Sequence, residues 1–319
     1  MNPVGMSPLT ERSLLFVTGK GGVGKTTVAA GLAQMLADQG KSVLACEIDA
    51  KGDLAGAFEI ADGGFTPVSV GENLKVMSMD TEASLREYLR IHLRIPIVGR
   101  IGPLAKAFDF LATAAPGVKE ILTVGKLCWE VREKHYDVLV VDSPATGHIV
   151  GLLAAPQAIK ELVKVGLIRT QADWMLDILS DPAQTGLVIV TTPEEMPVAE
   201  TLELAQKVRE QTTVDLASVV VNRLLPERFG VREQAVFDAL SSKKGMAALS
   251  KELGVDAEPV LAAATLATSL RRSRTTHLDT LRGGLEPGTP LVLVPELFQR
   301  TDGVRATRQV ATHLSEELL

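Results

Sequence analysis

Short apolar runs alternate with longer amphipathic stretches along the chain, and turn residues separate them. This alternation is typical of βαβ units that build a parallel sheet. Runs such as Val138–Val141 and Leu187–Val190 are apolar at successive positions, which indicates strands that helices cover on both faces. The predicted strands are Leu14–Val17, Ser42–Ile48, Lys75–Met79, Val138–Asp142, Leu187–Thr191, Ala217–Asn222 and Leu291–Val294.

The pattern extends over nearly the whole chain, so we expect one α/β domain over residues 1–319. No Pro/Gly/Ser-rich linker divides it. The longest segments between strands, at about 82–135 and 224–282, are predicted to be helical insertions. In the first of them apolar residues recur at helical spacing, at Ile121, Val124, Cys128 and Val131.

Composition and charge narrow the class of protein. A chain of 319 residues with 46% hydrophobic content can bury a large core. No window approaches 18 consecutive apolar residues, and the first 12 residues lack the apolar region of a signal peptide. We therefore expect a cytoplasmic protein that is not an integral membrane protein. The net charge of -6 argues against nucleic acid as a partner.

Cysteine and arginine positions offer few further sites. Cys46 and Cys128 are far apart and form no C-x-x-C pair, so we expect free thiols and no zinc site. Arg271, Arg272 and Arg274 lie close together in a predicted helix with His277. Such a run is usually a solvated helix face, and we assign it no function.

A glycine-rich loop directly follows the first strand. It satisfies G-x-x-x-x-G-K-[ST] with the residues Gly19, Lys20, Gly21, Gly22, Val23, Gly24, Lys25, Thr26 and Thr27. Glycines let several backbone N–H groups point at one anion, and the helix that begins near Lys25 adds its positive end. We expect Lys25 at the β- and γ-phosphates of ATP, Thr26 as a Mg²⁺ ligand and Thr27 near the α-phosphate.

The string GKGGVGKTT, with its additional early lysine, resembles the deviant Walker A loop of a family of P-loop ATPases. That family contains the ArsA-type ATPases, the tail-anchored protein targeting ATPase, the nitrogenase iron protein and MinD. The resemblance implies that Lys20 crosses a dimer interface to the nucleotide of the partner subunit, as an arginine finger does. The alternative is a solvated loop lysine.

The segment Glu47–Leu54, after the second strand, occupies the place of switch I in this family. ArsA-type members usually have D-P-A-H there, and this chain has D-A-K-G-D, closer to the D-P-K-A-D of the nitrogenase iron protein. The resemblance points to Asp49 as the residue that orients or deprotonates the attacking water. For Asp53 two interpretations stay open, an N-cap of a short helix at 54–58 and a switch role.

The segment Val141–His148 is similar to the ArsA-type switch II, D-T-A-P-T-G-H. Asp142 ends an apolar strand, where a Walker B carboxylate would hold Mg²⁺ through water. Gly147 would move toward the γ-phosphate and donate its backbone N–H. The role of His148 is left open.

Two weaker matches concern the adenine end of the nucleotide. Asn222 corresponds to the asparagine that reads adenine in this family, and Pro295, Leu297 and Phe298 lie in the place of the loop that covers the base. The P-G-x-x-E stretch at 116–120 and the T-T-x-E stretch at 191–194 extend the resemblance over nearly the whole chain.

The resemblance implies a P-loop NTPase fold, a mostly parallel central sheet with helices on both faces and helical insertions. It implies an ArsA-like ATPase that binds ATP or ADP with Mg²⁺ and acts as a nucleotide-switched homodimer or heterodimer with a paralogue. An unknown protein or membrane partner would be its load. Two alternatives are a nucleotide-sensing scaffold subunit of a heterodimer with little turnover and a MinD- or ParA-like positioning ATPase. Metalloid binding is not expected, because soft metalloids need thiolates and the two cysteines, Cys46 and Cys128, lie in a predicted core strand and in a helical stripe.

Overall fold

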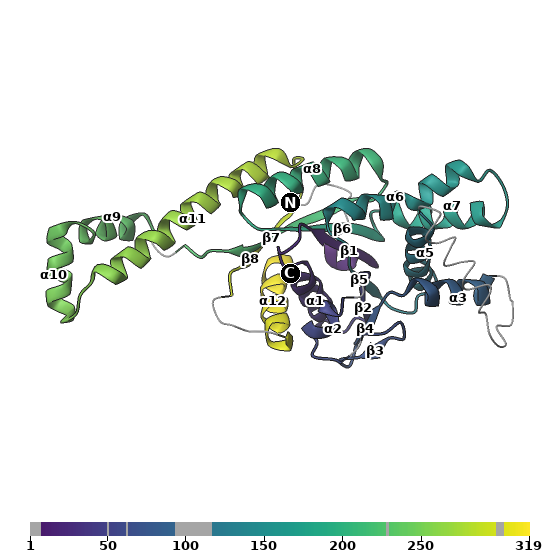
Figure 1. The fold of residues 1–319 in the computed structure, drawn as a ribbon, viewed down its shortest axis with the longest axis horizontal. Helices are drawn as coiled ribbons and strands as arrows, with labels where there is room; N and C mark the ends of the chain where they lie inside the picture. Colours follow the sequence, from purple (N-terminus) through teal and green to yellow (C-terminus); the bar gives the residue numbers. More distant parts are fainter. Residues whose placement is uncertain (1–7, 50, 62, 93–116, 228–229, 298–302) are drawn as a thin grey trace.

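A parallel sheet forms the centre of the computed structural model, which describes residues 8–49, 51–61, 63–92, 117–227, 230–297 and 303–319. In this part of the chain eight strands form one sheet in the order β3-β4-β2-β5-β1-β6-β7-β8 (Figure 1). Every neighbouring pair is parallel except β3 and β4. The strands are β1 (Leu14–Gly19), β2 (Val43–Glu47), β3 (Val68–Ser69), β4 (Leu74–Ser78), β5 (Val138–Asp142), β6 (Thr185–Thr191), β7 (Leu216–Leu224) and β8 (Leu291–Pro295).

Helices cover both faces of the sheet, as the unbroken apolar runs predict. A short 3-10 helix, η1, spans Leu9–Glu11. The α-helices of the described residues are α1 (Lys25–Asp38), α2 (Asp53–Ala57), α3 (Thr81–His92), α5 (Val118–Arg132), α6 (Thr146–Leu162), α7 (Leu167–Leu179), α8 (Glu195–Gln211), α9 (Val231–Leu240), α10 (Lys243–Leu253), α11 (Glu258–Gly284) and α12 (Gly303–Leu318).

Successive residues of each strand point to opposite faces and so contribute to two separate cores. On β1, Leu15 and Val17 pack in the core that α1, α2 and α12 cover. Leu14 and Phe16 pack in the other core, which α5, α6, α7, α8 and the last turns of α11 cover. The sheet is therefore buried on both sides, and its strand ends are the places where polar residues gather.

The prediction of an α/β fold with a mostly parallel sheet is confirmed. The seven predicted strands correspond to β1, β2 and β4–β8, and the central place of the apolar strands Val138–Asp142 and Leu187–Thr191 is confirmed by the strand order. The pattern missed β3, because its two exposed residues carry no apolar alternation. It pairs antiparallel at the edge beside β4.

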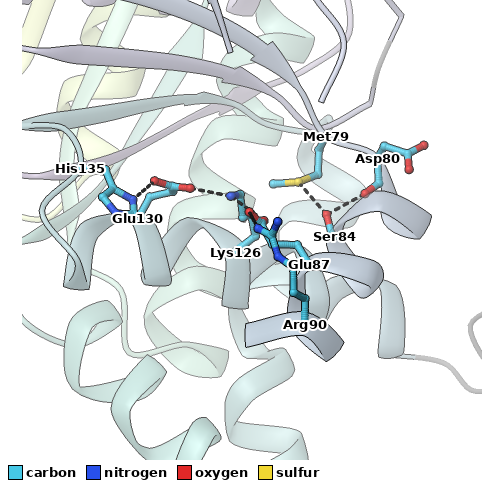
Figure 2. A network of polar contacts seen from close by, with 8 residues as sticks. All are labelled: Met79, Asp80, Ser84, Glu87, Arg90, Lys126, Glu130 and His135. Atoms are coloured by element: carbon cyan, nitrogen blue, oxygen red, sulfur yellow. Dashed lines mark hydrogen bonds and ion pairs between the residues drawn. The ribbon is translucent and has the colours of Figure 1, made fainter. Parts of the chain in front are cut away.

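Helices α3 and α5 fall within the first predicted insertion, of which residues 93–116 lie outside the described residues. A partly buried network of polar contacts lies where the two helices meet (Figure 2). Lys126 of α5 lies 2.6 Å from a carboxylate oxygen of Glu87 on α3 and 2.5 Å from one of Glu130. His135 contacts Glu130 at 2.6 Å. The contact between Lys126 and Glu87 joins α3 to α5, at the end of the molecule away from β8 (Figure 1).

Helices α9, α10 and α11 fall within the second predicted insertion and project away from the sheet (Figure 1). We call residues 231–270 the helical arm. Among the described residues of α11, the buried Leu278 and Leu281 of its last turns belong to the core that α5, α6, α7 and α8 cover. Within the described ranges, every helix is too short or too polar to cross a lipid bilayer. The prediction of a single domain over 1–319 stays a prediction.

Candidate nucleotide site

The candidate residues gather at the carboxyl ends of the central strands, where ligands of parallel α/β sheets bind. The glycine-rich loop follows β1 and leads into α1 at Lys25. On the two sides of β1, Asp142 ends β5 and Thr191 ends β6. The strand order thus brings together segments that lie more than 100 residues apart in the sequence.

The backbone of the glycine-rich loop adopts conformations that L residues avoid. Gly22 has φ 87° and Gly24 has φ 92°. A Cβ atom at Gly24 would also lie 2.4 Å from the Nδ2 atom of Asn222. Because Gly24 stands at the N-cap of α1 and has no side chain, it leaves the first N–H groups of the helix available to an anion. Thr26 and Thr27 lie in the first turn of α1, beside Lys25.

Thr26 and Asp142 form the most direct contact between two predicted site residues. The Thr26 hydroxyl donates to Oδ2 of Asp142 at 2.6 Å. The other carboxylate oxygen, Oδ1, is buried and accepts no hydrogen bond from any described residue. A hydroxyl beside a carboxylate with a spare oxygen is an all-oxygen donor set, which suits Mg²⁺. These residues therefore fit the metal ion that accompanies ATP.

The carboxyl group of Asp142 is strongly influenced by its surroundings. Burial raises its pKa from 3.8 to about 6, the hydrogen bond from Thr26 and the charge of Lys25 lower the pKa, and the carboxylates of Glu47 and Asp53 raise it. Desolvation is thus the main cause, as expected for a carboxylate that a cation would neutralise.

The predicted switch II loop is tied to the strand that carries the glycine-rich loop. Thr18 donates its hydroxyl to the carbonyl of Pro144 at 2.7 Å, and the N–H of Ser143 donates to the carbonyl of Val17 at 2.9 Å. Gly147 lies in the first turn of α6, with open space where a Cβ would stand. His148 beside it is exposed. The contact of the Gly147 backbone N–H with the γ-phosphate stays a prediction.

The predicted switch I loop carries an exposed carboxylate. The side chain of Asp49 is 41% exposed and lies 4.0 Å from Nζ of Lys51. Ala50 lies outside the described residues. The N-cap interpretation of Asp53 is wrong, because α2 begins at Asp53 and Gly52 is its N-cap. The backbone N–H of Asp53 instead donates to Oε1 of Glu47 at 3.2 Å. The sequence alone indicated no role for Glu47.

Lys20 has a partner within its own chain. Its Nζ atom lies 2.5 Å from Oε1 of Glu200 on α8, and the two side chains are 31% and 30% exposed. Lys20 is therefore not a freely solvated loop residue. Glu200 is 180 residues away in the sequence, and no local pattern marked it.

Asn222 braces the glycine-rich loop from the end of β7. Its Nδ2 donates to the carbonyl of Val23 at 2.8 Å, and its Oδ1 accepts from the N–H of Arg223 at 2.9 Å. Arg223 has φ 57°, an uncommon conformation for a residue with a side chain. Contact of Asn222 with adenine stays a prediction. In the structure the same side-chain amide supports the glycine-rich loop through its hydrogen bond to Val23.

Arg274 of α11 connects the helical arm to this end of the sheet. It donates to the carbonyl of Arg223 at 2.8 Å and lies 3.5 Å from Glu194 and 3.9 Å from Glu296. Its side chain is only 21% exposed, so the interpretation of the arginine run as a purely solvated face is wrong for this residue.

The remaining predicted segments are partly described. Pro295 ends β8, and Pro295 and Leu297 are half-buried. Phe298 and Pro116 lie outside the described residues. Glu194 directly precedes α8 and donates its N–H to the carbonyl of Thr192 at 2.8 Å. Contacts of Pro295 and Leu297 with a base stay predictions.

Both cysteines are buried in the core. Cys46 packs in β2 and Cys128 in α5, as the sequence pattern predicts. Burial raises the pKa of the Cys46 thiol to about 12 and also raises that of Cys128, so both thiols are protonated at neutral pH. Among the described residues no three His, Cys, Asp or Glu side chains are grouped closely enough to hold a metal ion by themselves.

The chain is similar in sequence to a known family and to several curated proteins. A family model described as "Anion-transporting ATPase" matches residues 12–176 and 168–244. ATPase BagA of Mycobacterium tuberculosis is 34% identical over 231 residues, which are 69% of this chain and 67% of that protein. A putative arsenical pump-driving ATPase of Halobacterium salinarum is 30% identical over 70% of this chain and 37% of that protein. ATPase get3 of Neurospora crassa is 28% identical over 70% of this chain and 77% of that protein.

Proposed function

Because the chain belongs to the family of anion-transporting ATPases, we propose that it hydrolyses Mg-ATP as a nucleotide-switched dimer. That it is an ATPase of the ArsA type follows from the family. The single observation that best supports this site for the reaction is the contact of Thr26 with Asp142 beneath the glycine-rich loop. In this contact the Thr26 hydroxyl, from the glycine-rich loop motif, donates a hydrogen bond to the Asp142 carboxylate, from the predicted switch II motif.

The glycine-rich loop and α1 would bind the phosphates. Backbone N–H groups from Gly19 to Gly24 and the uncapped start of α1 supply fixed dipoles, and Lys25 supplies a full charge at the β- and γ-phosphates. Thr26 and Asp142 would hold Mg²⁺, which neutralises charge on the phosphate oxygens when bound. Asp142 would do so through water.

Asp49 would orient the attacking water. The water oxygen bonds to the γ-phosphorus, the bond from that phosphorus to the β,γ-bridging oxygen breaks, and ADP leaves. Asp49 accepts the hydrogen bond, and finally the proton, of the water. The side chain of Asp49 is 41% exposed, so its carboxylate is accessible to a water molecule. Positioning is the main contribution of the protein, since this chemistry needs little covalent help.

Lys20 would act on the nucleotide of the partner subunit. Its pairing with Glu200 supports this role, because the contact draws the ammonium toward α8 and leaves both side chains about one-third exposed. An exchange of that carboxylate for phosphate oxygens across a dimer interface costs little, since partly exposed ion pairs contribute about 1 kcal/mol or less. Dimer closure would thus complete each site with a charge from the neighbour.

Mixing two inactive variants tests the role of Lys20. We expect Lys20→Ala and Asp49→Asn to be nearly inactive when each is alone. In a mixed dimer, the site that retains Asp49 receives Lys20 from its neighbour, so about half of the parental activity per dimer returns. Phosphate release after subunit exchange measures the recovery. No recovery, with exchange verified by labelled subunits, rules out action in trans.

The load of the ATPase is proposed to be a protein or membrane partner rather than a metalloid. One relative is named an arsenical pump-driving ATPase, and that name describes the relative. In this chain both thiols are buried and protonated, whereas soft metalloids need accessible thiolates. A homodimer and a heterodimer with a paralogue are both compatible with the proposal. The mixing experiment tests the homodimer, and for a heterodimer one change would be made in this chain and the other at the matching position of the paralogue.

A further inference from the structure

Glu47 is a buried carboxylate at the edge of the candidate site. It ends β2 and pairs in register with Ser78 of β4 on one side and Asp142 of β5 on the other. Its exposed fraction is 3%. A carboxylate taken out of water is costly unless hydrogen bonds compensate for its lost hydration. The partners of Glu47 therefore indicate what the residue does.

Those partners are consecutive N–H groups of one loop. Oε1 accepts from the backbone N–H groups of Lys51 and Asp53, and Oε2 accepts from that of Gly52, all at 3.2 Å. The Ser78 hydroxyl adds a contact to Oε2 at 3.4 Å. Successive N–H groups that converge on one anion form a nest. Because Gly52 cannot cap α2 with a side chain, the carboxylate of Glu47 takes the place of the cap.

The same loop carries Asp49, and it is held on both sides of that residue. Before Asp49, the N–H of Ile48 donates to the carbonyl of Asp142 at 3.1 Å. After it, the N–H of Lys51 donates to Glu47. Asp49 is itself 41% exposed, and among the described residues the one ion pair of its carboxylate is with Lys51 at 4.0 Å. Its position thus depends more on the fixed backbone around it than on contacts of its own carboxylate.

We propose that Glu47 is a positioning residue for ATP hydrolysis, whose carboxylate holds the loop so that Asp49 meets the attacking water. The inference rests on the proposed role of Asp49. Glu47 touches neither phosphate nor water in this account, and it acts through the backbone of Lys51, Gly52 and Asp53. A loop that shifts by about 1 Å can lower a rate by up to 10²-fold without changing the affinity for substrate.

A purely structural role would have a different signature. If Glu47 only capped α2, its loss would lower thermal stability and the fraction of folded protein, and each folded site would still turn over normally. A positioning role lowers kcat for each nucleotide-binding site and leaves the KM for ATP unchanged. The kcat for each nucleotide-binding site, measured together with KM and thermal stability, therefore distinguishes the roles.

The test is Glu47→Gln in the full chain, with turnover normalised to the number of ATP sites found by calorimetry. The amide keeps the volume and one acceptor oxygen, but its NH2 group cannot accept from Gly52. We expect kcat to fall about tenfold or more, with KM within about twofold of the parent. Glu130→Gln is the matched control, because Glu130 is also buried, at 6% exposure, and lies in α5. That change should leave kcat within about twofold.

Asp49→Asn, measured in parallel, separates the two proposals. If it turns over like the parent, the assignment of Asp49 fails. If it is inactive while Glu47→Gln has the parental kcat, only the inference about Glu47 is overturned. When Glu47→Gln is added to Asp49→Asn, kcat should fall no further than in Asp49→Asn alone. Should Glu47→Gln not fold, Glu47→Asp retains the charge with a shorter reach, and a parental kcat in that variant overturns the inference as well.

Discussion

The central sheet and the helical arm at residues 231–270 bury their apolar residues to very different extents. The strands contribute to two large cores, in which most side chains of β1, β5 and β6 have no exposed surface. Among its described residues, the arm has a core of three buried side chains, Phe237, Ala257 and Leu261. Its exposed apolar residues include Val236, Leu253, Val255, Val260, Leu266 and Leu270.

This difference shows where the molecule can hold chemistry in place. A dense core fixes the strand ends, and the strand ends fix charged groups such as Asp142 and Glu47. Helices with few buried contacts open locally at a low free energy, so the arm is suited to motion rather than to precise positioning. Every residue to which we assign a chemical role accordingly lies outside the arm.

The largest expected effect contrasts one leucine from each region. Leu36 of α1 is fully buried, and Leu36→Ala should reduce the free energy of unfolding by about 3–4 kcal/mol, through lost burial and a cavity. Leu261→Ala, in the arm, should cost about 1–2 kcal/mol, because its thin core can collapse. Urea unfolding followed by circular dichroism measures both. Equal losses would show that the arm is as tightly integrated as the sheet.

A second contrast concerns nucleotide affinity. Lys25→Ala removes the charge proposed to face the phosphates, and its Kd for Mg-ATP should rise at least ~100-fold, about 2.7 kcal/mol. Leu261→Ala should bind Mg-ATP like the parent, because the arm holds no residue of the site. Isothermal titration calorimetry compares them. An affinity of Lys25→Ala within a few-fold of the parent would contradict the P-loop assignment.

A smaller effect is expected at Arg274, where α11 meets the sheet. Arg274→Ala removes the hydrogen bond to the strained Arg223, and we expect a loss of about 1 kcal/mol, since the side chain is partly exposed. Hydrogen exchange of the α11 amides should become faster. Arg272 is exposed, and Arg272→Ala serves as the control with little change. Identical exchange in both variants would mean that Arg274 does not anchor the arm.

No effect is expected from thiol reagents or metalloids, because both cysteines lie in the densely packed region. At pH 7 the native protein should react with Ellman's reagent only after denaturation, since burial raises the pKa of the Cys46 thiol to about 12 and that of Cys128 as well. Arsenite should leave phosphate release unchanged, and purified protein should hold no stoichiometric zinc by elemental analysis. Stimulation by arsenite that Cys46→Ser abolishes would reverse this view.

The sequence predicted the features that depend on neighbouring residues. Apolar runs located seven strands because a strand buried on both faces must be apolar at successive positions. The glycine spacing identified the loop that enters α1, because positive φ values at Gly22 and Gly24 are a local requirement. The two-residue β3 was missed, since exposed residues at a sheet edge need no apolar pattern.

The contacts that join distant segments were decided by the tertiary structure alone. The sequence by itself determined that Lys20, Thr26, Asp49 and Asp142 belong to recognisable loops. It did not reveal that Glu200 pairs with Lys20, that Glu47 holds the Asp49 loop or that Arg274 bonds the end of β7. The physical reason is that residues up to 180 positions apart meet only after strand order and helix packing are set. A buried carboxylate such as Glu47 is explained by its hydrogen-bond partners, and only the folded chain supplies them.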